Sequence, residues 1–349
     1  MRYTHQRYFI QEHLQETVQD GGIGYVDGER ILVREGFQPI HFPRHHDFSF
    51  TAKLVRLLFL LRCWWGLPRH SIIVFQYPLY AGMNKLLLSA LRLRPSIRVI
   101  CLLADINGLK QGDAGLLRRE VHLFRRYHYF IVHNEAMRSW LLRQVPDAQT
   151  EITGFFDFLA SPVQAPGRLS GEIAFAGNLY KSLFLEQLPQ VVKAQPDLRF
   201  RVYGPHATAA MQNGPGIRYE GVFPPYEMPR LLQGSFGLVW DGDGIEGADG
   251  SMGQYMEFIS HHKLSLYLVS GMPVLVYARA GSAALVQQYG LGIGISSLLE
   301  IGEKIGALTE ADYQAMCRNV QEAGRKIAAG DCLREALTKL LARMQRVKA

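Results

Sequence analysis

The feature that most constrains this fold is an alternation of short apolar runs with helical patterns, repeated in two successive series. The apolar runs that predict strands lie at 7–10, 39–42, 71–76, 98–105, 129–134, 172–177, 199–204, 217–221, 236–241 and 273–277. The amphipathic patterns that predict helices lie near 25–35, 51–65, 84–93, 116–127, 135–144, 182–194, 225–233 and 260–270. Such alternation is typical of parallel sheets covered by helices, so the sequence predicts an α/β fold with two such units.

The chain has 349 residues, which is enough for two ordinary domains. Residues 159–170 are rich in Pro, Gly and Ser and have no periodicity, so they predict a linker. We therefore expect one domain at 1–158 and a second at 171–328, followed by a helical segment at 329–349 that can pack back on the first domain. Ligands of parallel sheets bind beyond the carboxyl ends of the strands, so two facing units predict a cleft between them.

The formal net charge of +7 favours anionic partners, but no Lys/Arg run is long enough to indicate nucleic-acid binding. The four cysteines lie far apart without CxxC spacing, which argues against a zinc site or a disulfide framework. The N-terminus lacks the pattern of a signal peptide, and no apolar stretch reaches the roughly 20 residues of a membrane span. These features predict a cytoplasmic protein.

The first strand of the second series ends in a turn suited to phosphate, AFAGNLYKS at 174–182. Gly177 permits close approach, Asn178 can donate and accept hydrogen bonds, and Lys181 adds positive charge beside backbone amides. An ordinary strand-to-helix turn has the same composition, so both interpretations stay open. Tyr203 and Gly204 end the next strand at the same edge of the sheet, and the corner tyrosine Tyr226 can stack on a base or simply pack on its neighbours.

Asp241 and Asp243 form a D-x-D pair, which can hold a divalent ion on a diphosphate. Asp-Gly pairs also mark solvated turns, and that interpretation is favoured here. The histidines of HFPRHHDF, namely His41, His45 and His46, also allow a metal site, but no second cluster has matching spacing. We expect a solvated loop there.

A positive cluster stands at the start of the helix predicted at 260–270. Ser260 is the expected N-cap, and His261, His262 and Lys263 fall in the first turn. Cations are unfavourable there because the helix dipole is already positive at its N-terminus. Either an anion binds at this position or the cluster is exposed to water.

The segment KLVRLLFLLRCWWGLPR at 53–69 is basic, aromatic and amphipathic. It is too short to span a bilayer but is suited to a membrane surface. A helix that faces the protein core is the alternative, and it is favoured by the strand that follows at 71–76.

Several motifs, in this order, resemble bacterial GT-B glycosyltransferases of the glucosyltransferase 3-like and galactofuranosyltransferase group. In the second half they are FAGN at 175–178, VYG at 202–204, GSFGLVWDGD at 234–243 and HKLSLYLVSGMPVLV at 262–276. In the first half they are VFQYP at 74–78, CLLADINGL at 101–109 and YFIVHNEAMRSWL at 129–141. The resemblance implies two Rossmann-like domains facing a central cleft, with the acceptor bound by the first and a UDP-linked nucleotide sugar by the second.

The resemblance also implies roles for individual residues. Gly177, Asn178 and Tyr203 would line the nucleotide, and Tyr226 and Asp241 would border it. Lys181 and Gly204, at the same edge, complete the predicted nucleotide-sugar site.

Tyr255 and Lys263 would contact the diphosphate in the same comparison. Lys263 would replace a metal ion as the group that neutralises the leaving phosphate. The resemblance therefore implies neither metal nor cofactor, and makes the D-x-D pair of Asp241 and Asp243 coincidental.

The chain departs from the family pattern at two positions. Leu266 stands where wider retaining GT-B families have a glutamate that binds ribose, so their stereochemistry does not carry over. Ala104-Asp105 stands where the nearest group has His-Asp, which leaves Asp105 as the candidate base that takes the proton of the acceptor hydroxyl.

Three hypotheses follow. The leading one is a metal-independent glycosyltransferase that moves a hexosyl or galactofuranosyl unit to a glycan acceptor in bacterial surface polysaccharide or glycoprotein assembly. It allows peripheral membrane contact and a homo-oligomer, and it excludes nucleic acid as a partner. A non-catalytic subunit that binds nucleotide sugar, and a metal-dependent transferase that uses Asp241 and Asp243, are the alternatives.

Overall fold

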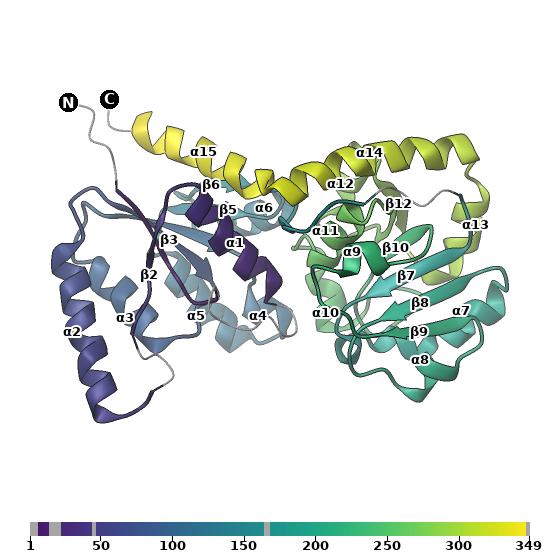
Figure 1. The fold of residues 1–349 in the computed structure, drawn as a ribbon, viewed down its shortest axis with the longest axis horizontal. Helices are drawn as coiled ribbons and strands as arrows, with labels where there is room; N and C mark the ends of the chain where they lie inside the picture. Colours follow the sequence, from purple (N-terminus) through teal and green to yellow (C-terminus); the bar gives the residue numbers. More distant parts are fainter. Residues whose placement is uncertain (1–5, 14–21, 44–46, 164–167, 347–349) are drawn as a thin grey trace.

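The computed structural model of the chain describes residues 6–13, 22–43, 47–163 and 168–346. In these residues two six-stranded sheets lie side by side along the longest axis (Figure 1). All neighbouring strands in both sheets are parallel. The α/β prediction is therefore confirmed.

The first sheet has the order β2-β1-β3-β4-β5-β6. Its strands are β1 (Arg7–Ile10), β2 (Gln38–Ile40), β3 (Ile72–Tyr77), β4 (Arg98–Leu103), β5 (Tyr129–Val132) and β6 (Gln149–Ile152). Its helices are α1 (Ile23–Arg34), α2 (Phe50–Gly66), α3 (Gly82–Leu91), α4 (Asn107–Lys110), α5 (Ala114–Phe124) and α6 (Glu135–Gln144). The strand order reverses between β1 and β3, which opens a crevice at their carboxyl ends.

The second sheet has the order β12-β11-β10-β7-β8-β9. Its strands are β7 (Glu172–Ala176), β8 (Arg199–Tyr203), β9 (Ile217–Gly221), β10 (Phe236–Val239), β11 (Val274–Tyr277) and β12 (Gly292–Ile295). The helical segments around it are η1 (Leu179–Lys181), η2 (Leu183–Gln187), α7 (Leu188–Ala194), α8 (Ala209–Asn213), α9 (Met228–Leu231), α10 (Gly250–Tyr255), α11 (His262–Val269), α12 (Ala283–Gln288), η3 (Leu298–Glu300), α13 (Ile301–Gly306) and α14 (Glu310–Ala329). Here the order reverses between β7 and β10.

The central strands are buried on both faces, as strands of parallel sheets covered by helices must be. In β3, the residues from Ile72 to Gln76 are all buried, and in β10 all four residues are. The sequence did not predict two edge strands, β6 and β12. The β6 sequence QTEI is mostly polar, and the β12 sequence GIGI is half glycine, so neither forms an apolar run.

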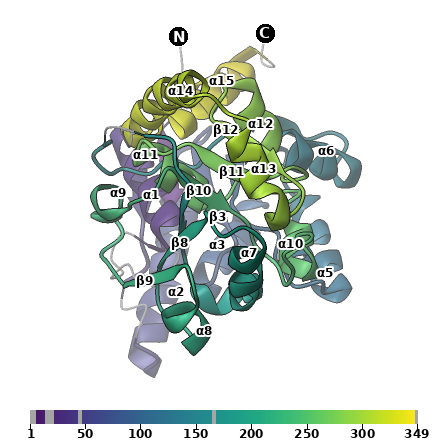
Figure 2. The same cartoon turned by 90° about the vertical axis from the view of Figure 1, so that its right-hand side faces the viewer.

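The helical region at the end of the chain is broken at Gly330. This residue has φ of 84°, a left-handed conformation that favours glycine, and it separates α14 from α15 (Asp331–Arg346). The two helices follow one edge of the molecule, with α14 over the second sheet and α15 over the first (Figure 1, Figure 2).

The last helix completes the core of the first domain. Buried side chains of α15, among them Leu333, Leu337 and Leu340, share one apolar cluster with Phe9 and Val74 of the first sheet. The start of α15 is held by Asp157, whose carboxylate accepts hydrogen bonds from the N–H groups of Cys332 and Leu333 at 3.0 and 2.8 Å. Burial raises the pKa of Asp157 to about 7.

Candidate functional site

A cavity of about 910 Å³ lies at the carboxyl ends of the first four strands of the first sheet. Gln11 and Glu12 follow β1, Tyr80 follows β3, and Asp105 follows β4. Lys181 reaches the same cavity from the second domain. The crevice predicted by the reversal of strand order between β1 and β3 is therefore an open space shared by both domains.

Asp105 is fixed by one residue from each domain. Its Oδ2 lies 3.0 Å from Nζ of Lys110, and its Oδ1 accepts a hydrogen bond of 3.0 Å from the hydroxyl of Tyr255. That hydroxyl in turn accepts the N–H of Ile106 at 2.7 Å. Tyr255, which the resemblance places at the diphosphate, thus holds the candidate base and joins α10 to α4.

A buried charge network forms at the other reversal point, between the ends of β7 and β10. Asp241 accepts hydrogen bonds from Nζ of Lys263 at 2.9 Å and from the hydroxyl of Ser182 at 3.0 Å. Lys263 also donates to the carbonyl of Trp240 at 3.1 Å, and its Nζ lies 4.4 Å from the centre of the Phe175 ring. Lys263 therefore stands at the predicted nucleotide edge with its charge already paired.

Electrostatics keep Asp241 ionised. Burial alone raises the pKa of its carboxyl, but the Lys263 ammonium and a contact with His261 outweigh burial and hold the pKa below its ordinary value. Nε2 of His261 lies 3.3 Å from Oδ2 of Asp241. An ionised aspartate beside the predicted phosphate site would repel an anion unless cations outnumber it.

The start of α11 differs from prediction. The N-cap is His261 rather than Ser260, whose hydroxyl accepts a hydrogen bond from Asn134 at 3.3 Å. His262 packs between the rings of Phe156 and Phe158, and burial lowers its pKa to about 4. The positive cluster is thus reduced at neutral pH, because His262 is uncharged and Lys263 is paired with a carboxylate.

Two glycines shape the predicted nucleotide edge in different ways. Gly204 has φ of 140°, and a Cβ there would lie 1.9 Å from the carbonyl oxygen of Gly177. A Cβ on Gly177 would meet nothing within 4 Å, so that edge is open. The side chain of Asn178 accepts the N–H of Tyr180 at 3.2 Å and caps η1, while Lys181 is exposed.

Two predicted tyrosines have their hydroxyl groups bound within the protein. Tyr203 is buried and accepts a hydrogen bond of 3.1 Å from the N–H of Gln233. Tyr226 donates to Asp27 at 2.7 Å and accepts from Arg30 at 2.8 Å, both of which belong to α1. Tyr226 therefore links the two domains, whereas the resemblance places it at the nucleotide.

Sequence reasoning missed His133, which follows β5 directly and is buried. Its Nδ1 accepts the N–H of Ser260 at 3.4 Å, and its Nε2 has no hydrogen-bond partner in the described part of the chain. Burial, against the opposing charge of Asp105, lowers its pKa to about 4. A polar residue at the end of an apolar strand beside the Asp105 strand was the signal available in the sequence.

The two aspartates of the D-x-D pair lie in different environments, because Asp241 is buried and Asp243 is exposed. Within residues 6–13, 22–43, 47–163 and 168–346, no group of three or more His, Cys, Asp or Glu side chains could hold a metal ion. His45 and His46 lie outside the described residues. In the described part of the chain, no helix is long and apolar enough to cross a membrane.

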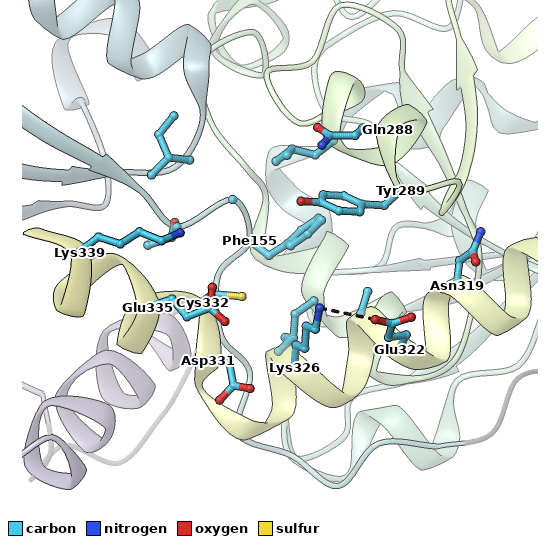
Figure 3. A pocket seen from close by; sticks show the side chains of 16 residues that line it. Phe155, Gln288, Tyr289, Asn319, Glu322, Lys326, Asp331, Cys332, Glu335 and Lys339 are labelled. Atoms are coloured by element: carbon cyan, nitrogen blue, oxygen red, sulfur yellow. Dashed lines mark ion pairs between the residues drawn. The ribbon is translucent and has the colours of Figure 1, made fainter.

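A second cavity, of about 490 Å³, lies away from these residues (Figure 3). The residues between β6 and the second domain, the helix α12 and the junction of α14 with α15 line it. Phe155 and Tyr289 contribute their rings, with centroids 6.3 Å apart, and an ion pair joins Lys326 to Glu322. None of the predicted site residues lies in this cavity.

Two sequence models of one family match this chain in tandem. The glucosyltransferase 3-like, N-terminal domain matches residues 7–149, and the glucosyltransferase 3-like, C-terminal domain matches residues 173–340. The family expected from the motifs is therefore confirmed.

Curated relatives and solved structures agree with this assignment. The beta-1,6-galactofuranosyltransferase WbbI of Escherichia coli (strain K12) is 25% identical over 79% of this chain and 81% of its own. The glucosyltransferase 3 of Streptococcus parasanguinis is 24% identical over 78% of this chain and 79% of its own.

Among solved structures, a sucrose-phosphate synthase from Thermosynechococcus elongatus has a TM-score of 0.67 at 13% identity, covering 99% of this chain and all of its own. Anabaena HepE, solved in complex with UDP and glucose, has a TM-score of 0.59 at 12% identity, covering 97% of this chain and 99% of its own. These likenesses confirm the GT-B fold.

Proposed function

Because the chain belongs to the glucosyltransferase 3-like family of glycosyltransferases, we propose that it moves a hexosyl or galactofuranosyl unit from a UDP-linked sugar to a glycan acceptor. Bacterial surface polysaccharide or glycoprotein assembly is the proposed setting, on the cytoplasmic side of a membrane. The names of the relatives support glycosyl transfer, and the UDP-bound HepE structure supports a nucleotide-sugar donor.

One observation carries the proposal. The carboxylate of Asp105 ends a strand of the first domain, borders the cavity of about 910 Å³, and is held there by Tyr255 of the second domain. A carboxylate in this position suits a general base, which takes the proton of the acceptor hydroxyl as its oxygen attacks the anomeric carbon. The bond from that carbon to the phosphate oxygen breaks in the same event, and UDP leaves.

Lys263 is the proposed group that neutralises the departing diphosphate in place of a metal ion. An ammonium has three N–H donors. Lys263 uses one on Asp241 and one on the carbonyl of Trp240, which leaves the third for a phosphate oxygen. Lys181, exposed at the same edge, supplies a second cation. Together the two lysines outnumber Asp241, so an anion is attracted. No metal or cofactor takes part in this proposal.

A thermal-shift experiment tests the donor site. We expect UDP to raise the melting temperature in the presence of EDTA, and the rise to disappear in Lys263→Met. That substitution leaves Asp241 buried without its partner and costs about 3 to 5 kcal/mol of stability by itself. The measured quantity is therefore the change on adding UDP, in Lys263→Met and in Lys263→Met/Asp241→Asn, which restores charge balance. Lys193→Met on α7 is the matched control. An unchanged UDP shift in both Lys263 variants refutes the role.

Turnover tests the base. Asp105→Asn keeps the size of the side chain but cannot take a proton, so we expect kcat to fall about 10²- to 10⁴-fold while the UDP shift persists. A turnover rate close to wild type rules out Asp105 as the base.

The alternative of a non-catalytic subunit is motivated by Ala104 and Leu266, which depart from the family pattern. It predicts UDP binding without turnover of any donor, even in Ala104→His. Screening nucleotide sugars by thermal shift, followed by turnover with the best binder, separates the two proposals and identifies the donor sugar. A metal-dependent transferase instead predicts loss of activity in EDTA and in Asp243→Ala.

A further inference from the structure

The helix α2 presents an apolar face to solvent. Its buried residues, Ala52, Arg56 and Leu60, follow one line that packs toward the domain. Six large apolar side chains of α2 that point away from that line are exposed, and they are Phe50, Leu54, Leu57, Leu58, Leu61 and Trp65. At about 100° per residue these six positions fall within roughly 100° of arc, opposite the buried line.

The exposure of this face is large. Leu58 is 57% exposed, Trp65 is 76% exposed and Phe50 is 81% exposed. Figure 1 shows α2 at the outer end of the first domain, away from the second domain. A continuous exposed apolar face of this kind marks an interaction site rather than an ordinary surface.

The helix is firmly attached, so the face is presented in a fixed orientation. Nε1 of Trp64 donates to the carbonyl of Ala90 at 3.0 Å. The guanidinium of Arg94 donates to the carbonyl groups of Trp64 and Leu67, the second at 2.6 Å. These contacts tie the end of α2 to α3 and the loop that follows it.

The charged side chains of α2 itself are all positive, and the acidic residue nearest to it in the sequence is Asp47, which precedes the helix. From Phe48 to Ala104 the sequence contains eight Lys and Arg residues and no Asp or Glu. Lys53 and Arg62 lie on the two flanks of the apolar arc and are exposed. Cations at the edges of an apolar helical face complement the anionic headgroups of a bilayer, whereas a second copy of this chain would bring like charges together.

We propose that the apolar face of α2 docks on an anionic lipid bilayer. The helix then lies in the plane of the interface, with its six apolar side chains among the acyl chains and Lys53 and Arg62 at the phosphates. Phe48, Lys53 and Arg56 also line the cavity that contains Asp105. Docking therefore brings that cavity close to the lipid surface, which, if the proposed transferase function holds, favours an acceptor carried by membrane lipid.

Vesicle sedimentation tests the docking without nucleotide or acceptor, so its result does not depend on the proposed transfer reaction. We expect the wild-type chain to sediment with vesicles of phosphatidylglycerol and phosphatidylethanolamine but not with phosphatidylcholine alone. Added salt should weaken this binding. Emission of Trp65 should shift to shorter wavelength on binding, and Trp65→Phe should abolish the shift.

Variants locate the surface. Leu58→Glu/Leu61→Glu should reduce vesicle binding at least about ten-fold, because each substitution removes an exposed leucine that docking would bury in the lipid. Arg62→Gln should reduce binding about five-fold. Leu299→Glu, at an exposed leucine of the second domain, should bind like wild type. Each variant should retain the thermal unfolding and the UDP shift of the wild-type chain.

Three results would overturn the proposal. They are absence of wild-type binding to anionic vesicles, equal binding by Leu58→Glu/Leu61→Glu, and a dimer of the free chain that this double substitution dissociates. If the wild-type chain binds anionic vesicles but transfers no sugar, the result counts against the transferase function and not against the proposed docking surface.

Discussion

At the scale of single residues, the candidate site is built from charges that the protein balances before any ligand binds. Asp241 is buried and ionised, and Lys263, His261 and Ser182 surround it. An unpaired buried charge is costly, so Asp241 fixes the position of Lys263 and holds its ammonium at the end of β10. The sequence pattern at this helix start predicted either an anion site or exposure to water, and it did not predict that a carboxylate of the same domain is the first partner of Lys263.

His133 gives the site a pH dependence of stability. Its pKa is about 4 in the folded chain, against 6.5 for the ordinary histidine. Below pH 6.5 the unfolded chain binds a proton on His133 that the folded chain does not bind. The contribution of neutral His133 to the free energy of unfolding is therefore complete above pH 6.5 and is lost as the pH falls toward 4. At about 1.4 kcal/mol per pH unit it reaches up to about 3 kcal/mol.

We expect the free energy of unfolding, measured in denaturant between pH 6.5 and 4, to fall less steeply in His133→Gln than in the wild-type chain. The pKa of Asp157 is raised to about 7, so its protonation increases the free energy of unfolding as the pH falls from 7 toward 4. Because this effect opposes that of His133, only the difference between the variants is informative. His122→Gln, at an exposed position, is the control. Equal slopes for His133→Gln and wild type would contradict the burial argument.

At the scale of elements, the edge formed by the ends of β7 and β8 depends on two glycines with different roles. Gly204→Ala forces alanine into a left-handed φ and places its Cβ against the carbonyl oxygen of Gly177, so we expect a loss of at least about 2 kcal/mol of stability.

The added Cβ of Gly177→Ala meets no atom within 4 Å, so this variant should unfold like wild type. If UDP lies against this edge, Gly177→Ala should still weaken UDP binding, measured by titration calorimetry. An unchanged UDP affinity in Gly177→Ala would show that the nucleotide does not lie against Gly177.

The sequence predicted the strands that are buried on both faces, and it did not predict edge strands whose residues are partly exposed. Apolar runs such as IIVFQY in β3 are typical of interior strands of a parallel sheet, whereas the edge strands β6 and β12 carry polar residues or glycine and gave no signal. Of the residues predicted for the site, Asp105 and Lys181 line one cavity, and Lys263 is paired with Asp241. Partners across the domains, such as Asp27 for Tyr226 and Asp105 for Tyr255, depend on how two separate sheets face each other. No local pattern contains that information.

At the scale of the whole molecule, the two domains are joined by more than their linker. Tyr226 binds α1, and Tyr255 binds Asp105. The chain then returns from α14 to the first domain, where α15 supplies part of the apolar core beside β1 and β3. The first domain is therefore completed only by the last described helix of the chain, and a segment ending before α15 would leave part of one face of its sheet uncovered.

Leu340 tests this arrangement, because its side chain is fully buried against the first sheet although it lies at the far end of the sequence. We expect Leu340→Ala to cost about 2 to 5 kcal/mol, as truncation of a buried leucine does. Hydrogen exchange should show the loss in β1 and β3, while β7 and β10 keep their protection and UDP still raises the melting temperature. Lys339→Ala, one residue earlier on the exposed side of α15, should leave both domains unchanged. Equal loss of protection in the two domains would mean that they unfold as one unit, and no loss in β1 and β3 would mean that α15 is dispensable to the first domain.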